Sequence, residues 1–545
     1  MVSLAMDPIQ TLDGDYDYII AGAGSAGCVV ANRLSTDPSK RVLLLEAGGS
    51  DRNFWLKLPV GYFRTIYDQR FSRLFETEPS EGTGGRGIVW PRGRVIGGSS
   101  SINGLVFIRG QHADFDEWDR LGAEGWSYRD VLPFFKRYER FGGPEDQWHG
   151  GFGEFETSDL RNRNRACDAW IEAAQQFGLP FNADFNAETT LGVGRYQLGI
   201  GKHWRTSSAA AFLHPIRESR PNLTVVSSAH ATRILFEGRR ATGIEYLKEA
   251  SVLTARAERE VVFCAGTLQS PQLLQLSGVG PAALLREHGV PVQVDAPDVG
   301  ANLQDHYQAR VIVKLREKRS LNDQVRSPTG LATMGAQWLF GQRGPLTVGA
   351  GQVGGMVRTA VARDARADVL FNVMPLSVDK PGDPLHRFSG FSASAAQCRP
   401  ESRGTVSIRS ADPLQPPRVV SNYLTAPHDI KVLVEGLKML RDIYRQPAFR
   451  DLITDDEYLP GRSIDSDAAL AEFGRNRGGT VFHPVGTCRM GQDDAAVLDP
   501  RLRVRGVERL RVIDASAMPT MTSANTNAAA ILIGERGADL LRAGA

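Results

Sequence analysis

The 545-residue chain has few cysteines, and they do not cluster. The five are Cys28, Cys167, Cys264, Cys398 and Cys488, an odd number scattered along the chain. Such usage suits a reducing compartment and gives neither the spacing of a metal site nor that of a disulfide framework. The sequence therefore predicts no metal ion, and we expect a cytoplasmic location.

Long apolar runs are also missing. No segment has the length and hydrophobicity that a membrane-spanning helix needs. The N-terminus has no basic region followed by an apolar core, so we expect no signal peptide and predict that residues 1–14 form a disordered leader. Peripheral contact with the inner membrane and assembly into a homo-oligomer are left open.

Neither sign of charge is in excess. The 64 lysines and arginines nearly balance the 62 aspartates and glutamates, which leaves a net charge of +2. A balance of this kind argues against nucleic acid as the main partner. The apolar content is that of an ordinary globular protein, and the length allows two to four domains.

A strand–turn–helix–strand unit opens the chain. Apolar periodicity predicts a buried strand over 16–21, a helix over 25–34 and a second strand over 41–45. Between the first strand and the helix lies the G-x-G-x-x-G turn of residues 22–27, and Glu46 follows the second strand. This order predicts a bound dinucleotide without deciding between NAD and FAD.

Each residue of that turn has a physical role in such a fold. Gly22 allows the tight turn, Gly24 lets the backbone approach a pyrophosphate, and Gly27 lets the helix pack closely on the strand. The N-terminus of the helix offers free N–H groups and partial positive charge to phosphates. Glu46 can accept hydrogen bonds from a ribose.

The rest of the chain contains a possible ligand-binding segment, two predicted helices and a region of alternating strand patterns. Residues 90–110 hold many glycines and serines with little side-chain bulk, which favours a segment lying along a ligand. We predict a helix that opens at Ser270-Pro271 and ends at 277–278, and another from Ala528 capped by the Asn-Thr-Asn before it. Residues 310–475 carry alternating strand patterns and a helix over 428–444, and are expected to face the substrate.

Four motifs together resemble the glucose–methanol–choline (GMC) family of FAD-dependent oxidoreductases over nearly the whole chain. They are DYIIAGAGSAG with Glu46, GRVIGGSSSINGLV at 93–106, AGTLQSPQLLQLSGVG at 265–280 followed by VGANLQDH, and HPVGTCRMG with SANTNA near the C-terminus. Within this family the sequence is most similar in its motifs to bacterial members acting on primary alcohols, such as alkanol and choline dehydrogenases.

The resemblance implies an α/β protein, α+β overall. A Rossmann-like FAD-binding domain would be discontinuous, formed by residues 15–115, 220–310 and 476–545. A substrate-binding domain built on an antiparallel sheet flanked by helices would be inserted between these pieces, from residues 116–219 and 311–475. This division would explain why ligand-like motifs occur at both ends of the chain.

The same resemblance assigns catalytic roles. His483 would lie over the reactive face of the flavin and accept the hydroxyl proton, since an imidazole of ordinary pKa ~6.5 is largely neutral at pH 7. Asn527 would occupy the second active-site position and donate to the substrate oxygen. Asn525 and Thr526 would cap the following helix and touch the flavin edge.

FAD is the implied cofactor, held without a covalent bond because Ile102 stands where some members have a linking histidine. The implied contacts are motif positions in both halves of the flavin domain. They are Gly22, Gly24, Ser25, Ala26, Gly27, Glu46, Ala47, Val95, Gly97, Asn103, Gly104, Leu105, Val106, Ala231, Asp514, Ala515 and Thr526.

The activity implied is oxidation of a primary alcohol to an aldehyde by hydride transfer to flavin N5, with electrons passed to a quinone or another acceptor. An oxygen-using alcohol oxidase is the first alternative. Choline dehydrogenase is the second, disfavoured because an approximate alignment places neutral Gln352 where choline-acting members have a glutamate. A non-redox hydroxynitrile lyase and a flavin photodecarboxylase also stay open; Cys398 near the latter's cysteine is more simply a buried apolar residue.

Overall fold

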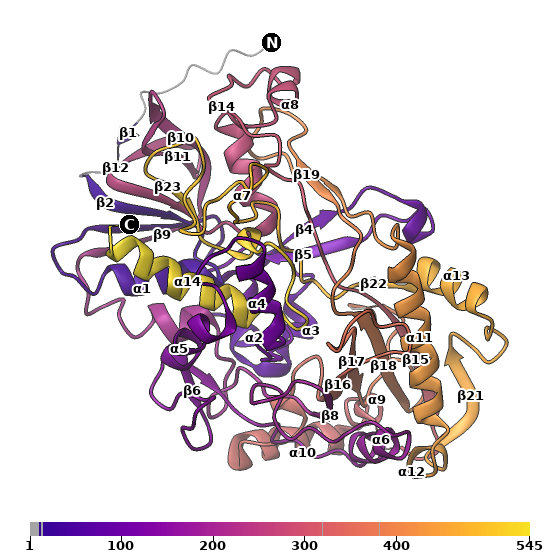
Figure 1. Cartoon of the computed structure of the whole chain (residues 1–545). Coiled ribbons are helices and arrows are strands. Elements are labelled where there is room, and N and C mark those ends of the chain that lie inside the picture. Colours follow the sequence, from indigo (N-terminus) through magenta and orange to yellow (C-terminus); the bar gives the residue numbers. More distant parts are fainter. Residues whose placement is uncertain (1–9, 12–14, 319, 381, 545) are drawn as a thin grey trace.

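The structure is a computed structural model that describes residues 10–11, 15–318, 320–380 and 382–544 (Figure 1). Two large sheets organise it. They lie in different parts of the molecule, one near the chain termini and one beside the long helix α11 (Pro427–Tyr444). The mixture of parallel and antiparallel sheets confirms the predicted α/β class.

The first sheet contains eight strands within the described ranges, in the order β10-β11-β12-β2-β3-β9, with β1 and β23 both paired to β12. The strands β12, β2, β3 and β9 pair in parallel, and β23 pairs in parallel with β12. The strands are β1 (Gln10–Thr11), β2 (Tyr16–Ala21), β3 (Val42–Glu46), β9 (Leu223–Ser227), β10 (Ala229–Glu237), β11 (Arg240–Lys248), β12 (Ser251–Phe263) and β23 (Leu510–Val512). Such a parallel core is typical of dinucleotide-binding folds.

Two helices from opposite ends of the chain pack side by side below this sheet in Figure 1. They are α1 (Ser25–Leu34) and α14 (Asn527–Arg542). A β-carbon on Gly534 would lie 2.9 Å from the carbonyl oxygen of Ala26, so the small residue permits the close approach. Arg33 and the fully buried Glu535 form an ion pair of 2.6 Å across this contact. Helices from the first and last parts of the chain are thereby held together.

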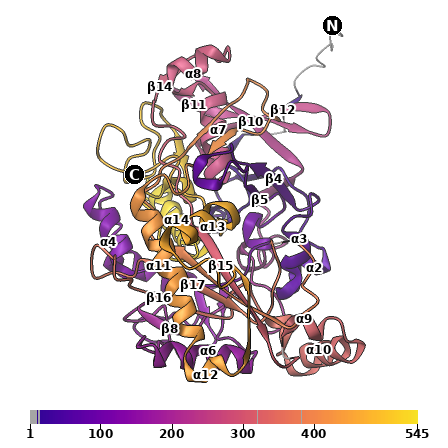
Figure 2. The same cartoon turned by 90° about the vertical axis from the view of Figure 1, so that its right-hand side faces the viewer.

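The second sheet is antiparallel, as predicted. Its order is β16-β17-β18-β15-β21, with β22 paired to β15. The strands are β15 (Tyr307–Leu315), β16 (Val353–Val357), β17 (Val369–Met374), β18 (Gly390–Gln397), β21 (Ile453–Leu459) and β22 (Gly479–Thr480). Helix α11 packs on β15, β17 and β18, and the turned view of Figure 2 shows it running beside the sheet.

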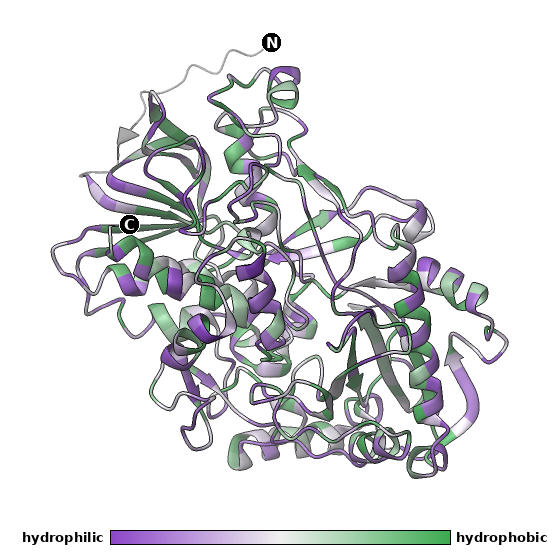
Figure 3. Ribbon diagram, viewed as in Figure 1, coloured by the Kyte–Doolittle hydropathy of each residue, from purple (hydrophilic) through white to green (hydrophobic). Residues whose placement is uncertain are grey.

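Hydropathy follows these packing contacts. In Figure 3 the inner strands of the second sheet are largely green and the outer strand β21 is purple, as its sequence ITDDEYL requires. Helix α11 buries Val432, Leu433, Leu437 and Leu440 on one side, the spacing of an amphipathic helix. In the described part of the chain, no helix is both long and apolar enough to cross a bilayer.

Shorter elements connect and cover the two sheets. The other helices are α2 (Phe54–Lys57), α3 (Tyr62–Thr65), α4 (His112–Arg120), α5 (Tyr128–Tyr138), α6 (Arg165–Gln176), α7 (Gly266–Leu276), α8 (Ala282–Glu287), α9 (Leu321–Gln324), α10 (Pro328–Gly341), α12 (Pro447–Arg450) and α13 (Asp467–Arg477). The other strands are β4 (Ser72–Glu76), β5 (Val89–Gly93), β6 (Glu139–Phe141), β7 (Phe155–Thr157), β8 (Gly192–Arg195), β13 (Val279–Gly280), β14 (Val294–Asp295), β19 (Thr405–Ser407) and β20 (Arg418–Val420).

Helix α7 begins earlier than the sequence suggested. The prediction that Ser270-Pro271 opens it was wrong, because Pro271 lies inside the helix. A proline has no N–H, so the carbonyl of Thr267 loses its helical donor. The hydroxyl of Thr487 donates to that carbonyl at 2.6 Å. A hydrogen bond from the distant C-terminal segment therefore makes the internal proline tolerable.

The predicted domain boundaries stay a prediction, although the strands of the first sheet do come from three separated segments. Helix α5, which the prediction assigned to the substrate part, packs against α14, and Arg137 pairs with Glu535 at 2.6 Å. Of the predicted leader, Gln10–Thr11 forms β1 and pairs with β12. Residues 1–9 and 12–14 lie outside the described residues.

Candidate active site

The glycine turn between β2 and α1 is shaped as its sequence predicts. Gly22 has a φ of +109°, and a β-carbon there would lie 2.4 Å from the carbonyl oxygen of Cys264. A β-carbon on Gly27 would lie 1.9 Å from the carbonyl oxygen of Gly22, so this glycine sets the close packing of helix on strand. Gly24 differs, because its β-carbon would meet only the Cys264 carbonyl, at 3.8 Å. The space beside Gly24 is therefore free for a ligand.

Glu46 ends β3 beside this turn. Its carboxylate accepts hydrogen bonds from the N–H groups of Ala23 at 2.9 Å and Gly48 at 2.7 Å. Burial raises the pKa of Glu46 to about 7, against the lowering effect of these two donors. A buried carboxylate held by backbone donors is well placed to accept further hydrogen bonds from ligand hydroxyls.

Two adjoining cavities open from the turn. We call the first the glycine-turn cavity, which spans about 970 Å³ including its mouth open to solvent. The second is the histidine cavity, which spans about 1500 Å³ measured in the same way and is lined by His483. The residues that line both are Ser25, Arg92, Ser99, Ala515 and Ala530. Together they form one elongated space, as an extended dinucleotide with an adjacent substrate requires.

Most of the predicted cofactor contacts line these cavities. Those lining the glycine-turn cavity are Gly22, Gly24, Ser25, Ala26, Glu46, Ala47, Ala231, Asp514 and Ala515. Those lining the histidine cavity are Ser25, Asn103, Gly104, Leu105, Val106, Ala515 and Thr526. The three described residues Gly27, Val95 and Gly97 line neither cavity; the N–H of Gly97 donates to the Ala23 carbonyl at 2.8 Å and so ties the two glycine-rich segments together.

Backbone and side-chain anchors hold His483 in place. Its N–H donates to the carboxylate of Asp305 at 2.7 Å, and the hydroxyl of Thr480 donates to the same carboxylate at 2.6 Å. Tyr423 donates a third hydrogen bond to it. Burial raises the pKa of Asp305 to about 6, although these donors lower it. The imidazole, 8 % exposed, therefore stands on a rigid polar support at the cavity wall.

His306 decides which nitrogen of His483 carries the proton. Its Nε2 lies 2.8 Å from the carbonyl oxygen of Cys398, which can only accept, so that nitrogen must carry hydrogen. Burial lowers the pKa of His306 to about 4, so its ring is neutral and its Nδ1 is an acceptor. The Nδ1 of His483 lies 2.9 Å away and must donate. The Nε2 of His483 therefore carries a lone pair and acts as a hydrogen-bond acceptor.

Asn525 faces that lone pair. Its amide nitrogen lies 3.0 Å from Nε2 of His483, and its amide oxygen is buried without a hydrogen-bond partner. Asn527 was predicted as the second catalytic residue. Its amide oxygen instead accepts a hydrogen bond from Ser25 at 2.7 Å, although Asn527 also lines the histidine cavity. Helix α14 begins at Asn527, and its N-cap residue Thr526 makes no side-chain capping bond, contrary to the predicted cap chemistry. The two asparagines are used for tertiary contacts instead.

Burial also lowers the pKa of His483 well below its usual range, and His306 and Arg92 lower it further. The neutral form is therefore favoured at neutral pH, which is the form able to accept a proton. Burial lowers the pKa of Arg92 to about 10, so this guanidinium keeps its charge. Its Nη1 donates to the carbonyl of Phe482 at 2.9 Å, next to His483.

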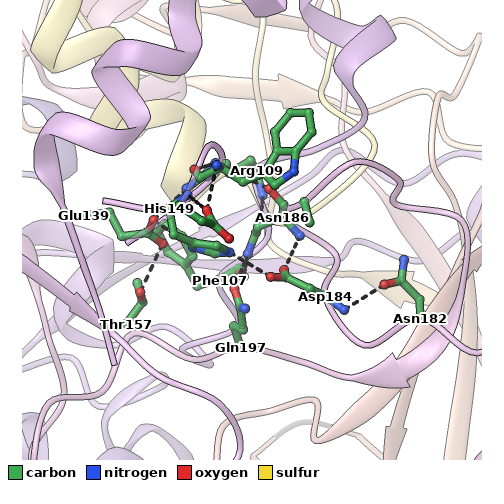
Figure 4. A network of polar contacts seen from close by, with 12 residues as sticks. Phe107, Arg109, Glu139, His149, Thr157, Asn182, Asp184, Asn186 and Gln197 are labelled. Atoms are coloured by element: carbon green, nitrogen blue, oxygen red, sulfur yellow. Dashed lines mark hydrogen bonds and ion pairs between the residues drawn. The ribbon is translucent and has the colours of Figure 1, made fainter. Parts of the chain in front are cut away.

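A buried ionic network follows the segment that lines the histidine cavity, and Figure 4 shows its polar contacts. Arg109 pairs with Glu139 at 2.7 Å, and both are almost fully buried. His149 contacts Glu139 through Nδ1 at 3.0 Å and Asp184 through Nε2 at 2.8 Å. Asn186 accepts from the N–H of Arg109 at 2.8 Å. These contacts fix the chain just beyond the 103–106 segment.

Of three further residues singled out in the sequence, one lines the histidine cavity and two do not. Ile102 is buried and lines the histidine cavity, where the sequence pattern placed it. Gln352 is buried and accepts from Asn162 at 3.2 Å, but it does not line that cavity; Gln308, on β15, does. Cys398 is fully buried in an apolar cluster and lines neither cavity. In the described ranges no group of acidic, cysteine or histidine side chains is placed to hold a metal ion.

His306 and Asp305 are the site residues that sequence reasoning missed, and Asn525 was predicted to cap a helix and touch the flavin edge rather than to contact His483. The first two lie in the VGANLQDH motif, which was recognised but given no role. A histidine directly before an alternating strand was the available signal. The contact between Asn525 and His483 could not be predicted from neighbouring residues. Asn525 and Asn527 lie in one short polar run, and the direction in which helix α14 begins decides which of them faces His483.

A parallel nucleotide-binding sheet with a paired histidine at its cavity defines a class, the oxidoreductases that hold a dinucleotide cofactor. Comparison with known proteins identifies the family. The N-terminal and C-terminal models of GMC oxidoreductases match residues 16–308 and 400–534. The chain belongs to the GMC oxidoreductase family.

Individual relatives agree. The chain is 39% identical to an alcohol dehydrogenase [acceptor] of Pseudomonas putida over 96% of this chain and 95% of that protein. It is 39% identical to an oxygen-dependent choline dehydrogenase of Escherichia coli over 97% and 95%. A structure of an Aspergillus oryzae formate oxidase, studied for its FAD modification, superposes with a TM-score of 0.90 at 25% identity over 98% and 99%. The predicted family and an FAD-dependent oxidoreductase are thereby confirmed.

Proposed function

We propose that the chain oxidises a primary alcohol to an aldehyde with non-covalently bound FAD, and passes the electrons to a quinone or another acceptor. The residues present fit this cofactor. Gly24 leaves space where a pyrophosphate would approach, and the buried Glu46 carboxylate faces the same cavity. Ile102 offers no atom for a covalent link.

One observation carries the proposal, namely the oriented pair His306 and His483. The hydrogen bond between their Nδ1 atoms leaves Nε2 of His483 as a lone-pair acceptor facing the histidine cavity. A fixed lone pair of this kind is what removal of a hydroxyl proton requires. His306 passes no proton further, because its other nitrogen already donates to a carbonyl. It therefore acts as a positioning residue.

The other groups orient the alcohol. Flavin, when bound, supplies the hydride acceptor. The amide N–H of Asn525 now points at Nε2 of His483 and can donate instead to a substrate oxygen placed between them. Thr526 lines the same cavity at the start of α14, where free backbone N–H groups and the helix dipole stabilise negative charge. Burial of His483 keeps bulk water from competing for its lone pair.

Several alternatives lose support. No aspartate or glutamate belongs to the described residues lining the histidine cavity, so a choline cation would lack a counter-ion there. Cys398 lies outside the cavity and offers nothing to a photodecarboxylase that depends on a thiol. An oxygen-using oxidase stays the main alternative, since its half-reaction with alcohol is the same.

Anaerobic flavin bleaching tests the proposal. Addition of a primary alcohol to the yellow protein without oxygen should remove the flavin absorbance near its long-wavelength maximum. No bleaching with any alcohol would exclude alcohol oxidation and favour the non-redox alternative. Readmission of oxygen then separates the two redox activities, because rapid recovery of colour identifies an oxidase and slow recovery a dehydrogenase.

A further inference from the structure

The second sheet presents a row of polar side chains to the histidine cavity. Arg310 on β15 pairs in register with Ser394 on β18, which in turn pairs with Asn372 on β17. All three line the cavity. Alternate residues of the same strands, such as Val311 and Phe371, belong to the apolar core on the other face. The row is therefore part of the cavity wall rather than of the core.

The guanidinium of Arg310 has no carboxylate partner. Among the described residues it makes no ion pair and no hydrogen bond, in contrast to Arg109, which pairs with Glu139 at 2.7 Å. No acidic residue of the described chain lines the cavity that it faces. Arg310 is partly exposed, and a cation held partly out of water in a cavity wall is normally paired. The missing anion is therefore expected to come with a ligand.

Two further donors that line the same cavity also lack partners. The hydroxyl of Tyr62, a residue 6 % exposed, and the amide nitrogen of Asn372 are buried without a hydrogen bond, and both residues line the cavity. Unsatisfied buried donors are rare in native proteins. A guanidinium, a phenol and an amide N–H together match the acceptor oxygens of a carboxylate.

The backbone spacing between this row and the histidine pair gives the scale of the ligand. His306, which contacts His483, directly precedes β15 and lies four residues before Arg310, so their Cα atoms are roughly 13 Å apart at the rise of an antiparallel strand. Apolar side chains of Phe63, Ile66 and Met374 line the cavity. An aliphatic spacer suits this lining.

We propose that the histidine cavity binds an alcohol with a carboxylate at the far end, an aliphatic ω-hydroxycarboxylic acid, and that Arg310 with Tyr62 and Asn372 holds the carboxylate. The inference rests on the proposed function for its alcohol end. With FAD bound, the hydroxyl proton would pass to His483 and a hydride from the carbinol carbon to the cofactor, which would leave an aldehyde. The carboxylate is unchanged throughout.

Selectivity among matched alcohols tests the proposal. Anaerobic flavin reduction is followed with ω-hydroxycarboxylates of roughly five to ten carbons, the primary alkanols of equal length, and choline. The wild type should prefer the hydroxycarboxylate over the alkanol by about 10- to 100-fold in kcat/KM, the value of a charge-assisted hydrogen bond. Equal values, or a preference for choline, would overturn it.

Variants test whether Arg310 causes the preference for hydroxycarboxylates over alkanols. Arg310→Gln should reduce the ratio of kcat/KM for hydroxycarboxylate over alkanol to near one, and Tyr62→Phe should reduce it several-fold. Arg358→Gln is the matched control, since it removes an exposed arginine three residues beyond the β16 glycine pair. It should leave the ratio as in the wild type. A ratio unchanged in both cavity variants contradicts the proposal.

A binding measurement separates this proposal from the proposed function. Hexanoate, which has no hydroxyl to oxidise, should perturb the flavin absorbance of the wild type, and the perturbation should be lost in Arg310→Gln and retained in Arg358→Gln. If no alcohol bleaches the flavin but hexanoate still binds through Arg310, the proposed function fails and the carboxylate site stands. If alkanols bleach the flavin and hexanoate does not bind, the site fails alone.

Discussion

The Nδ1 atoms of His306 and His483 lie 2.9 Å apart, and a single proton is shared across this contact. Since the other nitrogen of His306 donates to the Cys398 carbonyl, the proton belongs to His483. A contact between two residues 177 positions apart in sequence thus fixes the tautomer of the expected base.

His306→Ala should therefore lower the rate of anaerobic flavin reduction by about 10- to 100-fold, because the imidazole of His483 loses its orientation. The variant should also shift the acid limb of the kcat/KM profile to higher pH, since burial and the neighbouring His306 lower the pKa of His483. His306→Asn, whose amide oxygen can accept the same hydrogen bond, should recover part of the rate. An unshifted profile with equal loss in both variants would reduce His306 to a packing role.

His483→Ala removes the expected base. The protein should stay yellow, and flavin reduction by an alcohol should slow by roughly 10²–10⁴. His428→Ala, on α11 and outside both cavities, is the control and should reduce flavin like the wild type. Stopped-flow absorbance measures all three proteins, and reduction at the wild-type rate in His483→Ala would remove this residue from the mechanism.

Asn525 and Asn527 can be distinguished by paired alanine variants. Asn525→Ala should slow flavin reduction by about 10²–10³, because the amide that faces His483 is lost. Asn527→Ala removes the contact with Ser25 and should chiefly lower the melting temperature. The reverse pattern would restore the prediction made from the motif, in which Asn527 contacts the substrate.

Gly24→Val tests the cofactor site separately from the fold. The backbone at Gly24 is extended, and a β-carbon there meets no atom closer than 3.8 Å, so the protein should fold. The larger side chain would occupy the space of the pyrophosphate, and bound flavin should be lost. Flavin content per protein, measured by absorbance, and circular dichroism give the two readouts. Gly335→Val, on α10, is the control and should retain full flavin content.

The network of Figure 4 should make the folded protein less stable at alkaline pH. Burial alone would lower the pKa of His149, but hydrogen bonds from its ring to Asp184 and Glu139 raise it to about 9. A raised pKa means that this stabilisation is complete below pH ~6.5 and is lost as the pH rises through about 9.

The difference in melting temperature between the wild type and His149→Gln should therefore be largest near pH ~6 and shrink above pH ~9. His428→Gln makes the same chemical change outside the network and should show no such trend. A difference that stays constant over this range would mean that His149 is neutral in the folded protein.

The sequence correctly predicted those elements that depend only on residues close to one another in the chain. The strand β2, the glycine turn and helix α1 lie where the apolar period placed them, because burial and the absence of β-carbons act on neighbouring residues. Helix α7 was misplaced at Pro271, since the hydroxyl that makes this proline tolerable belongs to Thr487. The roles of residues 525–527 also depend on tertiary contacts, because each residue type in this polar run can cap a helix, bind a ligand or contact another segment.

The sequence by itself determined the family and the nucleotide-binding sheet and predicted His483 as the base, because glycine spacing, hydrophobic period and local motifs are properties of short segments. Only the tertiary structure decided that His306 fixes the proton on His483, that Asn525 faces it, and that Arg310 enters the cavity without a carboxylate. These are relations between residues far apart in the chain, and their distances depend on how two sheets and the first and last helices pack together.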